Sequence, residues 1–108
     1  TCIRDYIHVS DLALGHLKAL ECILDNQFKF EVLNLGTGKG FTVLELVKTF
    51  ERVNNIQIPF KFVARRRGDV PFSVADISKA KKITKWIPIY DLEEMCRDSW
   101  NWVSNNIK

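Results

Sequence analysis

The sequence predicts an α/β (α+β) fold, a single domain built from short strands and about four helices. Two observations support this class: three short segments have the apolar pattern of strands, and three longer segments carry apolar residues at helical spacing, with a fourth, short helix indicated by a capping residue. The two kinds of segment alternate through most of the chain. With 108 residues, the chain has room for one domain. Its 46% hydrophobic and 27% charged residues are typical of folded proteins.

The first strand and the first helix are predicted within the N-terminal 25 residues. Residues 3–9 alternate apolar and polar side chains, as a half-buried strand does. Ser10 or Asp11 can cap the helix that follows, because the first N–H groups of a helix need a side-chain oxygen. Apolar residues then recur at helical spacing, so we expect a helix over residues 11–25.

A glycine-rich turn separates the second strand from the second helix. Residues 30–35 predict a strand, and residues 36–40 contain three glycines. Thr42 and Glu45 have the spacing of a capping box, which predicts a helix that ends near Asn54. The turn lies where a dinucleotide-binding loop would, but its G-x-G-x-G spacing differs from that of such loops and of P-loops. We therefore favour a tight turn over a nucleotide-phosphate site.

The third strand is predicted at residues 60–63, and two helices close the chain. Asp76 is expected to cap a short helix that runs to about residue 83. Asp91 and Glu94 repeat the capping-box spacing, and the last helix is expected to reach about residue 105.

Residues 65–69, Arg-Arg-Arg-Gly-Asp, concentrate positive charge in one loop. Gly68 can adopt backbone dihedral angles that other residues rarely adopt. A guanidinium group suits phosphate, because its planar fork matches two oxygens at once. Side chains alternate in an extended loop, so either Arg66 faces a site while Arg65 and Arg67 face away, or the reverse holds. The competing interpretation is a solvated charge cluster.

A second block near the N-terminus places Arg4 beside Asp5 and Tyr6. Our hypothesis is that the two blocks meet around a phosphorylated ligand. Alternatively, Arg4 pairs with Asp5 or Asp11 at the surface, which would contribute little. Tyr6 is expected to be partly buried, and His8 to be packed or hydrogen-bonded rather than catalytic. No nucleophile–base pair and no metal-ligand spacing is evident.

Net charge and cysteine content indicate which partners and which cellular compartment to expect. The net charge of +3 is too small to predict a nucleic-acid binder by itself. The cysteines are Cys2, Cys22 and Cys96, with no C-x-x-C pair, and Cys22 and Cys96 lie in apolar helical patterns. This usage favours buried thiols in a reducing compartment, so a cytoplasmic location is expected. We expect no membrane partner, since no apolar run approaches the length of a membrane span.

Four motifs in this order resemble the C-terminal portion of UDP-glucose 4-epimerases, members of the extended short-chain dehydrogenase/reductase family. They are R-D-Y-I-H-V-S-D-L-A at residues 4–13, N-L-G-T-G at 34–38, R-R-R-G-D at 65–69 and A-D-I-S-K-A at 75–80. The resemblance covers essentially the whole chain. It separates less well between this enzyme and relatives that act on UDP-pentoses, UDP-uronic acids or dTDP-sugars, whether epimerases, dehydratases or decarboxylases.

The resemblance implies the C-terminal lobe of an isomerase of galactose metabolism, which interconverts UDP-glucose and UDP-galactose through an NAD-dependent 4-keto intermediate. Residues 1–108 would be the UDP-sugar-binding portion. Arg4 and Arg66 match the arginines that grip the diphosphate, and Asp69 matches the acid that contacts the uridine ribose. Tyr6 would line the pocket. The full-length enzyme would be a homodimer.

The resemblance also implies what this chain lacks. NAD binds an N-terminal Rossmann domain, and the glycine fingerprint and the Y-x-x-x-K motif of that domain are not in this sequence. We therefore expect no catalytic residue, no bound NAD and no activity for residues 1–108 alone. Without the Rossmann domain, the helix over residues 11–25 would expose apolar side chains, which predicts self-association or marginal stability. A non-catalytic basic module that binds phosphate-rich polymers is the alternative of a different class.

Overall fold

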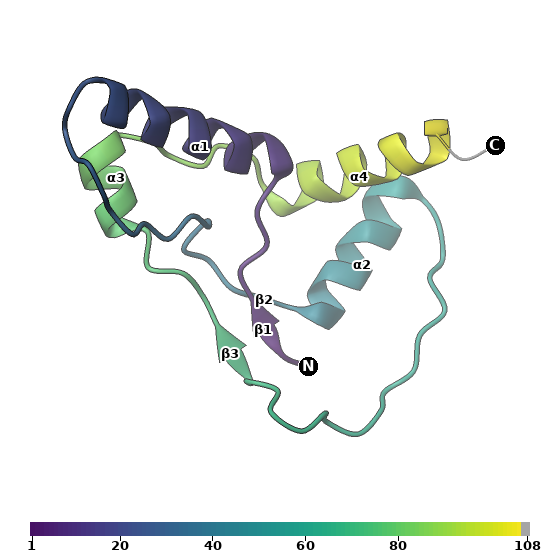
Figure 1. Ribbon diagram of the computed structural model, residues 1–108. Coiled ribbons are helices and arrows are strands. Elements are labelled where there is room, and N and C mark those ends of the chain that lie inside the picture. Colours follow the sequence, from purple (N-terminus) through teal and green to yellow (C-terminus); the bar gives the residue numbers. More distant parts are fainter. Residues whose placement is uncertain (107–108) are drawn as a thin grey trace.

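The computed structural model describes residues 1–106 and has four helices with a small mixed sheet (Figure 1). The sheet has the order β2–β1–β3, with β2 antiparallel and β3 parallel to β1. The predicted α/β (α+β) class is confirmed. The elements in chain order are β1 (Ile3–Arg4), α1 (Val9–Leu24), β2 (Phe41–Thr42), α2 (Val43–Asn54), β3 (Phe72–Ser73), α3 (Ser78–Thr84) and α4 (Leu92–Asn106).

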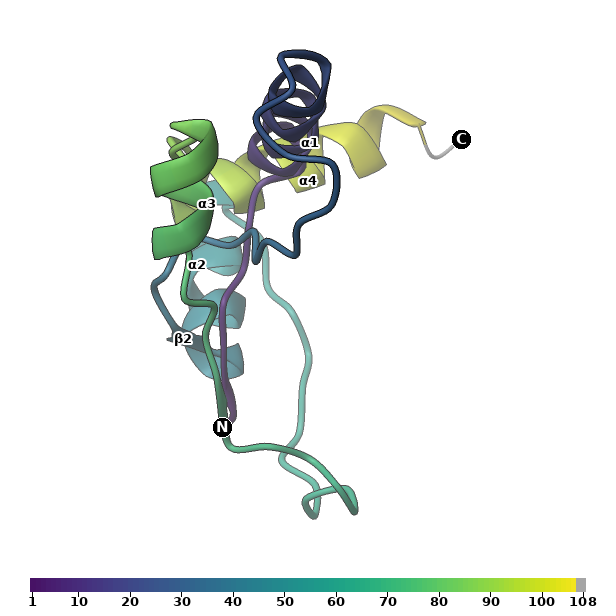
Figure 2. The same cartoon turned by 60° about the vertical axis from the view of Figure 1, so that its left-hand side comes forward.

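The helices form two separate pairs, and the molecule is open rather than compact. Helix α1 packs on α3 and helix α2 packs on α4, with the sheet beside them (Figures 1 and 2). Residues 55–71 form a long loop that extends away from the helices. The radius of gyration is 16.6 Å, whereas a compact domain of this length has about 13 Å. Large areas of the helices and loops therefore lie outside any shared core.

Two small clusters of buried side chains replace a single core. In the first, Leu92, Met95 and Cys96 of α4 pack against Leu46 and Phe50 of α2. This contact is reinforced by the side-chain amide of Asn54 at the end of α2, which donates to the carbonyl of Cys96 at 3.1 Å. The strong apolar stripe of α2 is therefore matched by one face of α4.

The second cluster surrounds Trp86, which is buried between α1 and the segment that follows α3. Its indole N–H donates to the carbonyl oxygen of Asp11 at 2.9 Å. Gly15 lets the ring and Leu35 approach α1, since a Cβ atom at this position would lie 2.9 Å from Leu35 Cδ1 and 3.2 Å from Trp86 Cε2. A larger residue at position 15 would displace one of these side chains.

The start of α1 differs from the prediction. Neither Ser10 nor Asp11 is the cap; His8 is, and its Nδ1 accepts from the backbone N–H of Ser10 at 3.0 Å. Asp11 is 1% exposed, and its carboxylate instead accepts from the N–H groups of Ile89 (3.0 Å) and Tyr90 (2.9 Å). The buried carboxylate thus holds the segment before α4 against α1.

The other predicted caps are largely confirmed. Thr42 Oγ1 accepts from the N–H of Glu45 at 3.0 Å. Asp91 and Glu94 form a reciprocal capping box at 2.8 and 3.2 Å. Only α3 departs from the prediction: Ile77 occupies its cap position, and Asp76 accepts from the N–H of Ser78 as an Asx turn before the helix.

Two of the predicted strands are wrong, and the first is shorter than expected. Residues 30–35 and 60–63 have the apolar sequence pattern of strands, but they pair with no strand among residues 1–106. The first strand covers two residues rather than residues 3–9, and its partners are β2 and β3. A strand forms when a neighbouring strand accepts its hydrogen bonds, and the local sequence does not specify that neighbour.

The Asp11 contacts give a direct test of this fold. Asp11→Ala leaves the N–H groups of Ile89 and Tyr90 without an acceptor, so we expect the free energy of unfolding to fall by about 3 kcal/mol. Asp25→Ala is the control, because Asp25 is exposed and lies just after α1. Urea denaturation followed by circular dichroism measures both. Equal stabilities for the two variants would contradict the role given to Asp11.

Candidate functional site

The carboxylate of Asp5 lies directly after β1 and binds two other segments of the chain. It accepts from the backbone N–H of Thr37 at 2.9 Å, from the Thr37 hydroxyl at 2.6 Å and from the N–H of Gly38 at 2.9 Å. It also accepts from the N–H of Ala75, after β3, at 3.3 Å. A Cβ atom on Gly36 would lie 2.6 Å from Asp5 Oδ2, so glycine is what allows the turn to approach.

The glycine turn is therefore a tight structural turn, as the sequence favoured. Gly38 has a φ of 76°, in the left-handed region. The N–H groups of Thr37 and Gly38, which a phosphate-binding loop would offer to its ligand, donate to the Asp5 carboxylate instead. A pyrophosphate placed here would meet a negative charge and two occupied donors. These residues do not fit the phosphates of NAD.

Arg4 lies in the central strand of the sheet, opposite Ser73 of β3. Its Nη1 donates to the carbonyl of Ile3 at 2.8 Å, and its side chain is half-buried. Within residues 1–106 neither Asp5 nor Asp11 forms an ion pair with Arg4, and both carboxylates accept backbone N–H groups instead. An open depression of about 580 Å³ lies beside this strand. It is lined by Arg4, Asp5, Asn34, Leu35, Ser73, Val74, Ala75 and Asp76.

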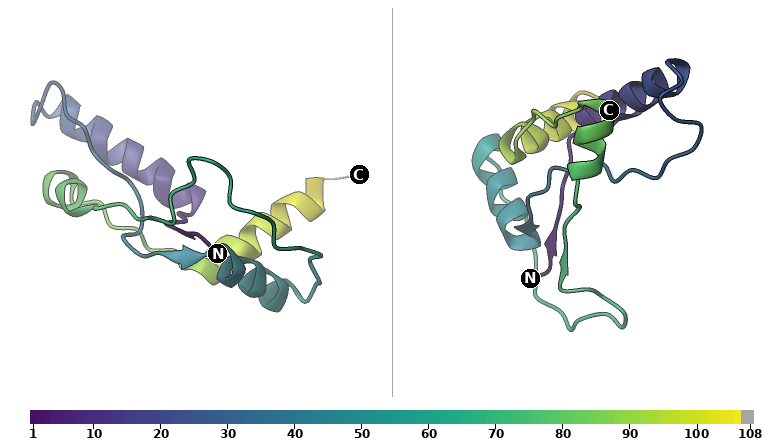
Figure 3. Two further views of the ribbon diagram at one scale, coloured as in Figure 1. Left: turned by 90° about the horizontal axis from the view of Figure 1, so that it is seen from below. Right: turned by 90° about the vertical axis from the view of Figure 1, so that its left-hand side faces the viewer.

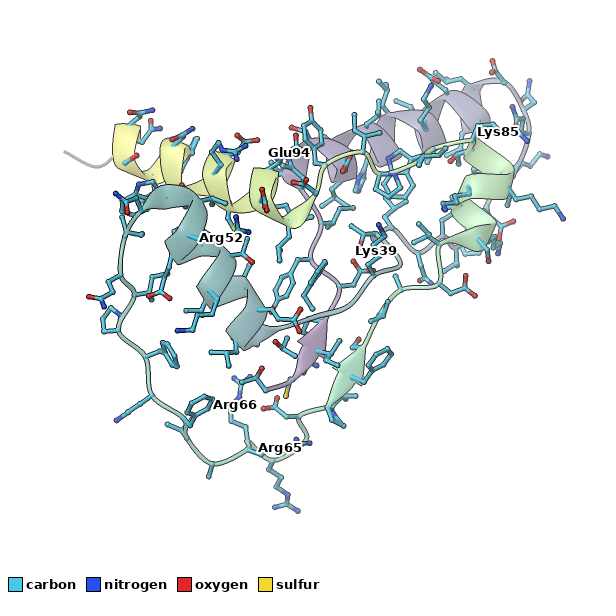
Figure 4. The ribbon with its side chains drawn as sticks, turned by 180° about the vertical axis from the view of Figure 1, so that it is seen from behind. Lys39, Arg52, Arg65, Arg66, Lys85 and Glu94 are labelled. Atoms are coloured by element: carbon cyan, nitrogen blue, oxygen red, sulfur yellow. The ribbon has the colours of Figure 1, made fainter. Side chains whose placement is uncertain are left out.

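The arginine loop is exposed, and Arg66 bonds within it. Arg66 Nε and Nη2 donate to the Asp69 carboxylate at 3.2 and 3.4 Å. Gly68 has a φ of 86°, which explains the glycine at this position. Figure 4 shows Arg65 projecting away from the molecule, whereas Arg66 turns back towards Asp69. The two neighbouring arginines therefore point in different directions.

The structure brings the two basic blocks together only to a limited extent. Strand β1 lies against β3, and the N–H of Ile3 donates to the carbonyl of Pro71, just after the arginine loop, at 2.9 Å. Arg66 is not among the residues that line the depression beside Arg4. The guanidinium groups of Arg4 and Arg66 are thus carried by adjacent segments but do not share one cavity.

Tyr6 and His8 continue from β1 into packed surroundings. Tyr6 is half-buried against the α2–α4 cluster, and burial raises the pKa of its phenol, while the nearby Arg4 charge opposes that shift. His8 Nε2 donates to Asp98 Oδ2 at 2.7 Å, and its ring stacks on Tyr90 with the ring centroids 4.3 Å apart. Both imidazole nitrogens are therefore engaged, and the interpretation of His8 as a hydrogen-bonded histidine is confirmed.

Asp5 and Asp11 are the polar residues that sequence reasoning undervalued. The sequence suggests both as surface partners for Arg4, and Asp11 also as a cap. Each instead binds N–H groups from segments at least 30 residues away. The one sign of this in the sequence is that the two carboxylates flank the mainly apolar residues 6–10. Within residues 1–106 the structure has no cluster of three candidate metal ligands, and no helix long and apolar enough to cross a membrane.

No family model matches the chain, but individual relatives do. It is 51% identical over 107 residues to a UDP-glucose 4-epimerase of Bacillus subtilis (strain 168), a match that covers 99% of the chain and 31% of the relative. The chain is homologous to one segment of UDP-glucose 4-epimerases. It spans about a third of the length of these enzymes.

Solved structures of UDP-glucose 4-epimerases contain the same arrangement. The enzyme from Stenotrophomonas maltophila, with bound NAD and formylated UDP-arabinopyranose, matches with a TM-score of 0.91 and 46% identity. That match covers 97% of this chain and 31% of the other. The enzyme from Bifidobacterium longum, in complex with NAD+ and UDP, matches with a TM-score of 0.86 and 38% identity over 98% of this chain and 31% of the other.

This similarity accounts for the open shape. The epimerase segment adopts the same conformation inside a chain about three times as long. Within residues 1–106 the two helix pairs share no common core, and specific hydrogen bonds connect the segments between them. The Asp5 and Asp11 carboxylates supply such bonds.

Replacing Asp5 tests whether its carboxylate holds the glycine turn and the segment after β3 in place. In Asp5→Ala the N–H groups of Thr37, Gly38 and Ala75 lose their acceptor, so we expect their hydrogen exchange to accelerate at least about tenfold. Asp76→Ala is the matched control, because that exposed carboxylate bonds to Ser78 alone among residues 1–106. Unchanged exchange at Thr37 and Gly38 in Asp5→Ala would rule out this role.

Proposed function

We propose that this chain forms the UDP-sugar-binding portion of a UDP-glucose 4-epimerase, an isomerase that interconverts UDP-glucose and UDP-galactose through an NAD-dependent 4-keto intermediate. The proposal rests on one observation: the chain is 51% and 50% identical in sequence, over essentially its whole length, to two such enzymes. The bound UDP of the Bifidobacterium longum enzyme and the bound UDP-sugar of the Stenotrophomonas maltophila enzyme support the ligand class.

Arg4 and Arg66 are the residues we assign to the diphosphate of the ligand. Each offers a planar fork of N–H donors, which bonds strongly to phosphate oxygens. Asp69 is assigned to the ribose hydroxyls, which can donate to a carboxylate, and Tyr6 to the wall of the pocket. Arg66 is exposed and Asp69 half-buried, and a pair at the surface contributes at most about 1 kcal/mol, so a diphosphate can displace it at little cost.

NAD would bind outside this chain, on the Rossmann domain of the full-length enzyme. The glycine turn at residues 36–40 does not fit its phosphates, because Asp5 occupies the N–H groups of Thr37 and Gly38. The chain accordingly supplies ligand-binding groups but no catalytic base. Residues 1–108 alone are expected to have no epimerase activity, and the complete enzyme is expected to be a homodimer.

Titration of the chain with UDP tests the proposal. Arg66→Ala should weaken binding about 10- to 100-fold, the loss expected for charge-assisted hydrogen bonds to phosphate. Arg65→Ala is the matched control: it removes the same charge from the same loop, but its side chain projects away from Asp69. Lys81→Ala, on the exposed side of α3, is a second control. Isothermal titration calorimetry at fixed salt concentration measures all four proteins.

The same titration separates this function from a polymer-binding module. A basic module would bind RNA with an affinity that falls steeply with salt, and Arg65→Ala and Arg66→Ala would then weaken binding equally. RNA binding of that kind, with no binding of UDP, would overturn the proposed function.

A further inference from the structure

The imidazole ring of His8 bonds to two different helices, one through each of its nitrogens. Its Nδ1 accepts from the backbone N–H of Ser10, in the first turn of α1, at 3.0 Å. Its Nε2 lies 2.7 Å from Oδ2 of Asp98 on α4. In both views of Figure 3 the start of α1 lies beside α4. A single side chain therefore links helices that belong to the two separate pairs.

These two contacts fix where the proton of the imidazole ring lies. A backbone N–H can only donate, so Nδ1 of His8 accepts from Ser10 and carries no proton. The proton of the neutral ring is therefore on Nε2, which donates it to the Asp98 carboxylate. A protonated ring has a donor at each nitrogen. The neutral ring with its proton on Nε2 is thus the only form that makes both contacts.

An added proton would keep one contact and break the other. It would occupy Nδ1, which would then direct a donor at the N–H of Ser10 and no longer accept from it. That N–H belongs to the first turn of α1, where the helix offers it no acceptor of its own. At Nε2 the effect is the opposite, because the negative charge of Asp98 strengthens its bond to a positive ring. The same proton thus loosens the start of α1 and tightens the link to α4.

The surroundings of His8 admit water and hold few other charges. The imidazole is 8% exposed, but the Asp98 side chain is 52% exposed, and an open depression of about 730 Å³ lies beside the pair. These two residues are the ionisable ones in its lining. Tyr90 stacks on the ring from the segment before α4, and tyrosine is uncharged between about pH 5 and pH 8. Asp11, in the same turn of α1, directs its carboxylate to the N–H groups of Ile89 and Tyr90 instead.

We propose that His8 is a proton-operated switch at the start of α1. The neutral ring caps α1 and donates to α4, whereas the protonated ring releases the cap and is held on α4 by an ion pair with Asp98. An imidazole changes charge between about pH 8 and pH 5, a range in which carboxylates stay ionised. Because Asp98 holds the ring in both states, the switch acts on the first turn of α1 and leaves the rest of the fold in place. It does not rest on the proposed function.

Nuclear magnetic resonance of the full 108-residue chain tests the switch with two readouts. Two-bond ¹H–¹⁵N correlations of the His8 ring should show the proton on Nε2 at about pH 7.5 and protons on both nitrogens at about pH 5. Over the same range the hydrogen-exchange protection factor of the Ser10 amide, corrected for the intrinsic effect of pH on exchange, should fall about fivefold, the loss expected when a helix cap is removed. The amides within α2 are the internal reference and should keep their protection.

Three variants assign the fall in protection to His8. His8→Asn is the matched control, because asparagine caps helices well but does not titrate, so the Ser10 amide should keep one protection factor throughout. His16→Gln removes the other histidine of the chain, which is exposed on α1, and should leave the fall unchanged. Asp98→Asn keeps an oxygen acceptor but removes the charge that favours the protonated ring, so the fall should occur at a lower pH.

Several results would overturn the switch. One is a proton on Nδ1 at neutral pH, since that tautomer cannot cap α1. Another is a constant protection factor for Ser10, or a fall of equal size in His8→Asn, which would assign the change to a different group. Loss of protection throughout α2 would show unfolding of the chain instead of a local change. A fall at the same pH in Asp98→Asn would overturn the ion pair.

Discussion

The carboxylate of Asp5 is the point at which three separate segments of the chain meet. It follows the central strand and binds the glycine turn on one side and the exit of β3 on the other. Because the strands are two residues long, their own ladder offers few hydrogen bonds. The register of the sheet therefore depends on a side chain more than is usual, and so does the position of Arg4 beside the depression.

Asp11 has the equivalent role in the first turn of α1. Its buried carboxylate fixes the segment before α4, while its carbonyl accepts from the indole of Trp86. His8 adds a third link by bonding to Asp98 of α4. His8 and Asp11, at the start of α1, thus hold the α1–α3 pair in place relative to the α2–α4 pair. The Asp11 carboxylate can do this in an open molecule because it accepts from N–H groups already fixed in the backbone.

The same openness explains why the candidate site is incomplete. The two basic blocks lie on neighbouring segments, but Arg66 bonds to Asp69 and stays outside the depression beside Arg4. A ligand with two phosphates and a ribose could join these groups, since a pair at the surface is easily displaced. The guanidinium groups of Arg4 and Arg66 and the carboxylate of Asp69 thus lie on neighbouring segments without forming one enclosed site.

The sequence by itself determined the helices, because apolar spacing and capping residues act within a few positions. The capping boxes at Thr42 and Asp91 are examples. The left-handed turns at Gly38 and Gly68 were equally local, since only glycine adopts those angles freely. The motifs also carried the resemblance to UDP-glucose 4-epimerases. The tertiary structure decided which extended segments became strands and what Asp5 and Asp11 bind. Both depend on partners at least 30 residues away, and no local pattern encodes such partners.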